Sequence, residues 1–165
     1  MMLCAASVVA LLVTLALQTS GVAPVVDVLA PLLTAVGLAA PRMRALVWAA
    51  LMGALWSPLV SCAPIIVIGI WCGIVLVLRG VARGVEWQQP IMAFGIAAAV
   101  SFSWQACAWL AGVASYVPPT LTRAMLLAFV ARPLTSGALF VVLFHPLVRC
   151  VRAPAARPRV RHAWD

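Results

Sequence analysis

Long apolar runs dominate the chain, and short interruptions rich in Arg, Pro and Gly separate one run from the next. A helix that crosses a membrane needs about 20 apolar residues, because each residue advances about 1.5 Å through about 30 Å of hydrocarbon. The pattern predicts an all-α fold, a polytopic membrane protein with a six-transmembrane-helix bundle over residues 1–148. The six crossings are expected at residues 2–18, 22–40, 45–62, 64–79, 90–113 and a last segment that ends near residue 148.

The last apolar segment is too long for one straight crossing, since residues 121–148 would form a helix of about 42 Å. Pro133 lacks a backbone N–H and disfavours helical geometry at Arg132, so we expect the last helix to be broken or kinked there. The final crossing would then begin near residue 130. Residues 118–130 would form either a re-entrant or interfacial helix or the start of a kinked crossing, and the sequence leaves both open.

Composition supports a membrane protein, because 66% of the 165 residues are hydrophobic, 8% are charged and the mean hydropathy is +1.16. Soluble domains carry about 25% charged residues to cover a surface that faces water. The apolar run at residues 2–18 also resembles a signal peptide, but no basic residue precedes it, so we interpret it as a first spanning helix.

Arginine placement predicts the orientation, because short cytoplasmic loops collect Arg and Lys. Both termini are then cytoplasmic, and residues 149–165 form a basic tail with no apolar periodicity, which we expect to be disordered. The tail either rests on anionic lipid headgroups or docks a cytoplasmic partner. The arginines that follow the second, fourth and sixth segments are Arg42, Arg44, Arg79, Arg83, Arg149, Arg152, Arg157, Arg159 and Arg161.

Two charges lie inside the apolar segments at matching predicted depth, Asp27 in the second and Arg132 in the last. A charge buried in lipid costs several kcal/mol unless it pairs or reaches the headgroups. We hypothesise that Asp27 and Arg132 form an intramembrane ion pair or line one polar docking pocket. The alternative is that each side chain reaches the headgroups separately.

Small and polar residues mark further candidate contacts. Gly53, Gly69 and Gly73 occur in small-xxx-small patterns that let helix backbones approach closely. We expect helix packing within the chain at these positions, and the alternative is a seam between two copies. Ser101, Trp104 and Gln105 share one helical face through their spacing. This face either contacts a polar ligand or hydrogen-bonds across helices.

Catalytic and metal-binding patterns are missing from the sequence. The chain has five cysteines without a CxxC pair, no paired carboxylates and no glycine-rich phosphate loop. We therefore expect no enzymatic activity, no cofactor and no metal. Nucleic-acid binding is not expected either, since no aromatic platform accompanies the basic tail.

The order of segments resembles the MreD family of rod shape-determining membrane proteins. The resemblance is carried by "LALQTSGVAPVVDVLAPLLTAVGLAAPRMRAL", by "LMGALWSPLVSCAPI" and by the last segment "TSGALFVVLFHPLVRCVR". In that family a Pro and an Asp open the second crossing, as Pro24 and Asp27 do here, and a Gly marks the third, as Gly53 does. Trp56 stands where the family has an acid.

The resemblance implies a non-enzymatic scaffold of the bacterial cell-elongation machinery in the plasma membrane. Such a scaffold binds MreC, a bitopic membrane protein, and through it helps to position peptidoglycan synthesis. The tail and inner loops would face the cytoskeletal side, and the segment near Arg123 and Arg132 would face the partner.

The six-crossing plan is also similar to the S-components that capture vitamins for energy-coupling-factor transporters. An outward pocket lined by Asp27, Arg132, Ser101 or Gln105 would then hold the substrate. An apolar pocket cannot select a polar vitamin, and the outer half of this chain offers few hydrogen-bonding groups, which favours the scaffold.

Overall fold

The computed structural model describes residues 27–60, 63–114 and 122–152. The predicted first crossing at residues 2–18, the first residues of the second crossing and the tail beyond residue 152 lie outside the described residues. All regular secondary structure within the described ranges is helical, as the sequence predicts.

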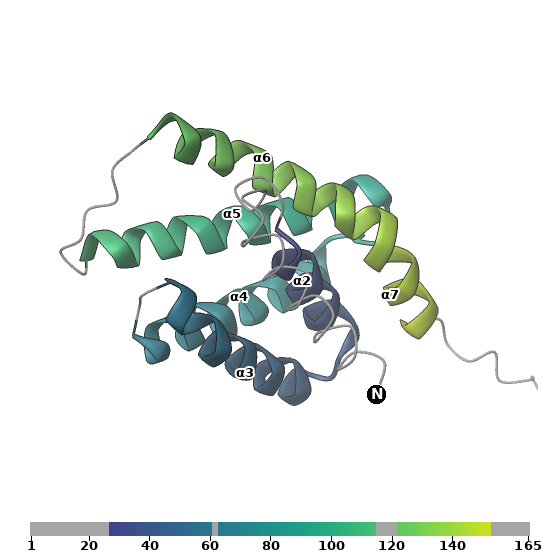
Figure 1. Ribbon diagram of the computed structural model, residues 1–165. Helices are drawn as coiled ribbons and strands as arrows, with labels where there is room; N and C mark the ends of the chain where they lie inside the picture. Colours follow the sequence, from purple (N-terminus) through teal and green to yellow (C-terminus); the bar gives the residue numbers. More distant parts are fainter. Residues whose placement is uncertain (1–26, 61–62, 115–121, 153–165) are drawn as a thin grey trace, which may run out of the picture.

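Seven helical elements follow one another along these ranges (Figure 1). The last three, beginning with α6, continue without a break and form one long helix that turns toward α7 (Figure 1). The elements are α2 (Leu29–Ala39), α3 (Arg42–Val60), α4 (Pro64–Gly84), α5 (Pro90–Ala114), α6 (Arg123–Leu139), the π-helical turn η1 (Phe140–Phe144) and α7 (His145–Arg152).

The number of helices that could span a membrane differs from the prediction. Within the described residues, three helices are long and apolar enough: Pro64–Gly84, Pro90–Ala111 and Met125–Cys150. The described parts of the second and third predicted segments, which form α2 and α3, are not among these candidate spans. The α2 helix has 11 residues and measures about 16 Å, too short for about 30 Å of hydrocarbon. The α3 helix has 19 residues and begins with Arg42 and Arg44, which precede the predicted third segment.

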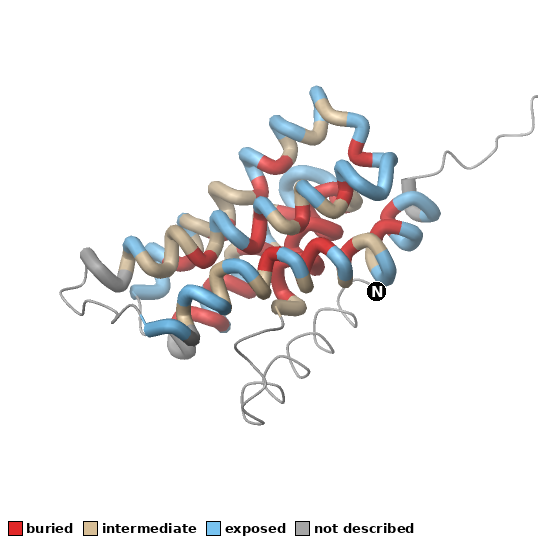
Figure 2. Tube along the Cα trace, turned by 90° about the horizontal axis from the view of Figure 1, so that it is seen from above, coloured by how far each residue is buried: buried red, intermediate tan, exposed pale blue. Residues whose placement is uncertain are grey.

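The short α2 helix lies at the centre of the bundle. It contacts each of the other described helical elements. Its residues from Leu29 to Leu38 are all buried, and the buried positions in Figure 2 gather along this middle part. A helix that is apolar on all sides must be surrounded by protein or lipid. Its one polar side chain, Thr34, donates its hydroxyl to the carbonyl of Ala30 at 2.8 Å.

Two helix pairs enclose α2, and glycine allows a close approach in each. In the α3–α4 pair, a Cβ on Gly53 would lie 3.0 Å from the Cα of Ile68. In the α5–α6 pair, a Cβ on Gly137 would lie 2.7 Å from the ring of Phe94. At Gly69 and Gly73 a Cβ would meet no atom of the described structure within 4 Å, so the packing expected at these two positions is not found there.

The irregularity of the last helix is not at Pro133, where the sequence predicts a break. Pro133 lies inside α6, and the wide turn occurs further along, at η1. In this turn the N–H of His145 donates to the carbonyl of Phe140, five residues back. The next residue, Pro146, has no N–H, and its ring would clash with a carbonyl four residues back in a regular helix. The wider turn relieves that clash.

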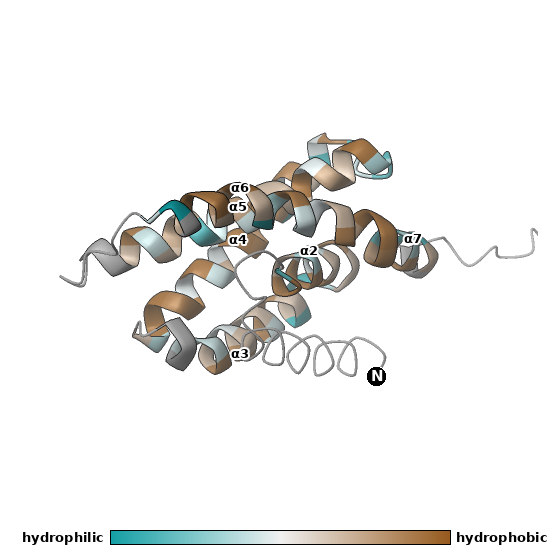
Figure 3. Ribbon diagram, turned by 45° about the horizontal axis from the view of Figure 1, so that its top comes forward, coloured by the Kyte–Doolittle hydropathy of each residue, from teal (hydrophilic) through white to brown (hydrophobic). Residues whose placement is uncertain are grey.

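Hydrophobic residues occur along every helix (brown in Figure 3), and many of them are exposed. Large hydrophobic residues that are more than half exposed occur on every long helix, as expected for a surface that faces lipid. Examples are Leu51, Val77, Phe102, Leu127 and Val142.

We predict that Gly53→Val destabilises the protein, because the added side chain meets the backbone of α4. Overpacking of this kind costs about 1–3 kcal/mol. Gly69→Val is the matched control on α4, since its Cβ meets open space. Thermal unfolding in mild detergent, followed by tryptophan fluorescence, should show a lower midpoint for Gly53→Val alone. Equal midpoints for the two variants would contradict the close α3–α4 contact.

Candidate functional site

Asp27 closes the N-terminal end of α2. Its Oδ1 accepts hydrogen bonds from the backbone N–H groups of Leu29 and Ala30, each at 3.1 Å. The next residue, Pro31, has no N–H to satisfy. The first turn of a helix leaves its N–H groups without partners, and a carboxylate also suits the positive end of the helix dipole. Asp27 therefore supplies what the start of a helix within the bundle requires.

Two serines connect Asp27 to the neighbouring helices. The hydroxyl of Ser101 on α5 donates to Oδ2 of Asp27 at 2.9 Å. The hydroxyl of Ser136 on α6 donates to the backbone carbonyl of Asp27 at 3.2 Å. Both serine side chains are fully buried, so the three helices meet at one polar junction inside an apolar bundle.

The predicted polar face of α5 divides between two sites. Gln105 donates its side-chain amide to the carbonyl and hydroxyl of Ser101, at 3.3 and 3.4 Å. Ser101 and Gln105 thus belong to the junction at Asp27. Trp104 instead packs edge-on against Trp71 of α4, with ring centroids 5.4 Å apart, and Trp71 also approaches Trp48 of α3.

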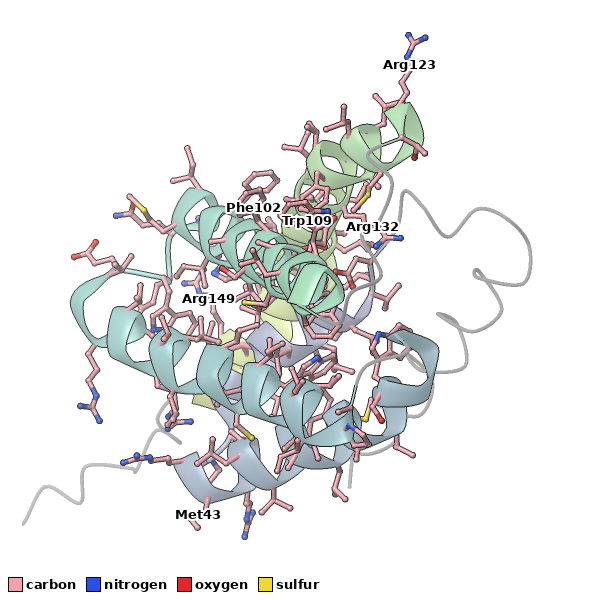
Figure 4. The ribbon with its side chains drawn as sticks, turned by 90° about the vertical axis from the view of Figure 1, so that its left-hand side faces the viewer. Met43, Phe102, Trp109, Arg123, Arg132 and Arg149 are labelled. Carbon is pink, nitrogen blue, oxygen red and sulfur yellow. The ribbon has the colours of Figure 1, made fainter. Side chains whose placement is uncertain are left out.

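Arg132 on α6 lies close enough to Asp27 for the two opposite charges to attract each other. Both side chains are partly exposed, and Figure 4 shows Arg132 at the side of the bundle. The backbone carbonyl of Arg132 accepts a hydrogen bond from Thr135 at 3.0 Å. The residues predicted at matching depth are thus electrostatic neighbours, and a direct ion pair between them stays a prediction.

Arg79 closes the opposite end of α2 and is the residue that sequence reasoning missed. Its Nη1 donates to the carbonyls of Gly37 at 3.0 Å and Ala40 at 2.7 Å. The sequence places Arg79 at the end of the fourth segment as an orientation signal, but α4 continues to Gly84. The apolar segment that ends before Pro41 could have indicated this role. A helix that ends there leaves backbone carbonyls that need a hydrogen-bond donor.

Opposite charges thus hold the two ends of α2. In many membrane transporters the ends of interrupted helices bind ions or substrate groups. Here Asp27 and Arg79, from within the chain, already occupy those positions. The arrangement can hold α2 in place, and it leaves the outer faces of the long helices for other contacts.

An apolar groove lies between α4 and α5, with a volume of about 580 Å³. Gly73 on α4 and Gly95 on α5 line it, and neither would have an atom of the described structure within 4 Å of an added Cβ. Ser103 and Cys107 are the lining residues whose side chains carry a polar atom. The groove therefore fits an apolar occupant. Its other lining residues are Ile70, Ile74, Val77, Leu78, Val81, Val85, Ile91, Met92, Ile96, Ala99 and Val100.

No group of three or more His, Cys, Asp or Glu side chains among the described residues could hold a metal ion. Comparisons of the chain with protein-family models, with curated proteins and with solved structures find no match. The features of the structure that bear on function are the junction at Asp27, the contacts of Arg79 and the α4–α5 groove.

We predict that Asp27→Ala lowers stability by about 1–3 kcal/mol, because it removes the helix cap and leaves buried donors unpaired. Asp27→Asn keeps an oxygen that can accept the same N–H bonds, so it should retain much of the stability. Thermal unfolding of the purified variants compares the two. Equal losses in both variants would show that charge, rather than capping, is what Asp27 contributes.

We also predict that Arg79→Met destabilises the protein by about 1–3 kcal/mol, since it leaves helix carbonyls without a donor. Arg83→Met is the matched control, because Arg83 lies one turn later on α4 and is exposed. The same unfolding measurement should show a lower midpoint for Arg79→Met only. A similar shift for both variants would indicate a general effect of removing charge from this end of α4.

Proposed function

We propose that this protein is a non-enzymatic membrane scaffold of the bacterial cell-elongation machinery. It holds the membrane helix of a bitopic, MreC-like partner and so helps to position peptidoglycan synthesis. The partner and the process come from the resemblance to the MreD family, and the observation that supports a scaffold is the α4–α5 groove.

The chemistry of the groove favours a helix as its occupant. Membrane helices associate through close packing at small residues, because lipid and helix surfaces are equally apolar. Gly73 and Gly95 offer such approach points on two helices of spanning length, and neither is covered by the described part of the chain. What distinguishes Gly73 and Gly95 from the other uncovered glycines is that they line the groove itself, where a helix backbone could approach both α4 and α5.

Vitamin capture, the alternative function, has less support. A site for a polar vitamin needs hydrogen-bonding groups that face the ligand. Asp27, Ser101 and Gln105 instead bond to α2 and to one another. The groove presents almost only carbon atoms.

Co-purification of the tagged protein from its native membrane in mild detergent tests the proposal. We expect a stoichiometric single-span protein with a large external domain, together with cell-wall synthases. Gly95→Leu should reduce recovery of that partner at least tenfold by filling the groove. Gly80→Leu is the matched control, because Gly80 lies in open space outside the groove.

The alternatives have distinct outcomes. Recovery of a pair of ATPases with a coupling subunit would replace the scaffold by a vitamin-capture protein. Full partner recovery with Gly95→Leu would remove the groove from the contact. Thermal unfolding of both glycine variants shows whether a reduced recovery of the partner is caused by misfolding.

A further inference from the structure

Hydrogen bonds bring the ends of several helices together at one end of the bundle. Arg79 of α4 donates to Ala40, just before α3 begins. The Nε2 of His145, the first residue of α7, lies 3.1 Å from the carbonyl of Gln88, between α4 and α5. The start of α3 and α7 therefore share this end, whereas the start of α6 lies at the opposite one (Figure 1).

Exposed arginines gather at this end, which we call the arginine end. It comprises Arg42 and Arg44 at the start of α3, Arg83 in the last turn of α4 and Arg149 on α7, all of them exposed. The acid described at this end is Glu86, and its carboxylate accepts a hydrogen bond from Gln89 at 2.9 Å. The end therefore carries a surplus of positive charge that faces away from the core.

The start of α3 conflicts with its own helix dipole. Cations are unfavourable at a helix N-terminus, where unpaired N–H groups already create positive potential. Arg42 and Arg44 nevertheless occupy the first turn of α3, and that turn contains no acid. Such a local conflict is expected where a residue serves a function. An anion placed there would be attracted by both arginines and by the helix end.

Apolar side chains among the arginines indicate where that anion comes from. Met43, between Arg42 and Arg44, is 70% exposed, and Leu147 on α7 is 58% exposed. Figure 4 shows Met43 pointing outward from α3. Cations interleaved with exposed apolar side chains fit the boundary between lipid headgroups and acyl chains. A free phosphate in water would contact the arginines only, whereas a lipid would also contact the exposed apolar side chains.

We propose that the arginine end binds the phosphate headgroups of anionic phospholipids. Arg42 and Arg44 engage a headgroup at the start of α3, Met43 inserts beside its acyl chains, and Arg83 and Arg149 extend the same contact around the bundle. This contact does not depend on the scaffold function. It assigns the arginine end to a leaflet that carries anionic lipid.

Lipid binding by the purified full-length protein tests the proposal. Native mass spectrometry from neutral detergent, with phosphatidylglycerol and phosphatidylcholine added in equal amounts, gives the dissociation constant for each lipid. We expect preferential binding of phosphatidylglycerol. Each arginine contributes roughly fivefold in affinity, so Arg42→Gln with Arg44→Gln should weaken phosphatidylglycerol binding about 25-fold. High salt should weaken binding to the native protein as well.

Arg123→Gln is the matched control. Arg123 is also exposed and also begins a helix, but it extends from the tip of α6 at the opposite end (Figure 4). It should leave the dissociation constant unchanged. The double variant should unfold at the same temperature as the native protein or a higher one without lipid, because it removes the conflict with the dipole. Reduced lipid binding in a fold that is equally stable separates the proposal from misfolding.

Three results would overturn the proposal. The first is a double variant that binds phosphatidylglycerol as tightly as the native protein does. The second is equal binding of the two lipids. The third is complete displacement of phosphatidylglycerol by soluble glycerol phosphate, which would identify a site for free phosphate instead of a membrane contact.

Discussion

The structure depends on hydrogen-bond partners for the backbone groups at both ends of α2, because this short helix begins and ends inside the bundle. Within an apolar interior, an unpaired backbone N–H or C=O costs several kcal/mol, so both ends of α2 need partners from the protein. Asp27 supplies acceptors at one end and Arg79 supplies donors at the other. The same contacts join α2 to α5 through Ser101 and to α4 through Arg79. The central helix is thereby fixed along its length, and the two outer helix pairs pack around it.

This requirement also explains how polar groups are distributed over the rest of the molecule. The polar side chains at the junction bond mainly to α2 and to one another, so the faces of the long helices remain apolar and suited to lipid or to another membrane helix. The α4–α5 groove and its uncovered glycines belong to those faces. The arginine end differs, since its charges are exposed and have no comparable task within the bundle. These two surfaces support the proposals of a partner helix and of anionic lipid.

Several elements follow directly from local sequence signals. Pro64 and Pro90 begin α4 and α5 at the positions predicted, because proline is favoured in the first turn of a helix. The pairing of Ser101 with Gln105 follows from their spacing of four residues. Pro133 misleads because a helix can continue through a proline when its neighbours hold it, while the wide turn η1 directly precedes Pro146, the second residue of α7. Gly137 offers no spacing pattern that distinguishes it from Gly69, and only the position of Phe94 reveals its role.

By itself, the sequence determined that the chain is helical, apolar and suited to a membrane, because hydrophobicity and helix-breaking residues act over short stretches. It also singled out Asp27 as an acid that needs a partner. The tertiary structure alone decided that α2 is a short central helix instead of a crossing, and that Arg79 completes it from α4. The residues that these two contacts join are 42 and 39 positions apart in the sequence. Their energies depend on which helix ends meet, and no local pattern of residues contains that information.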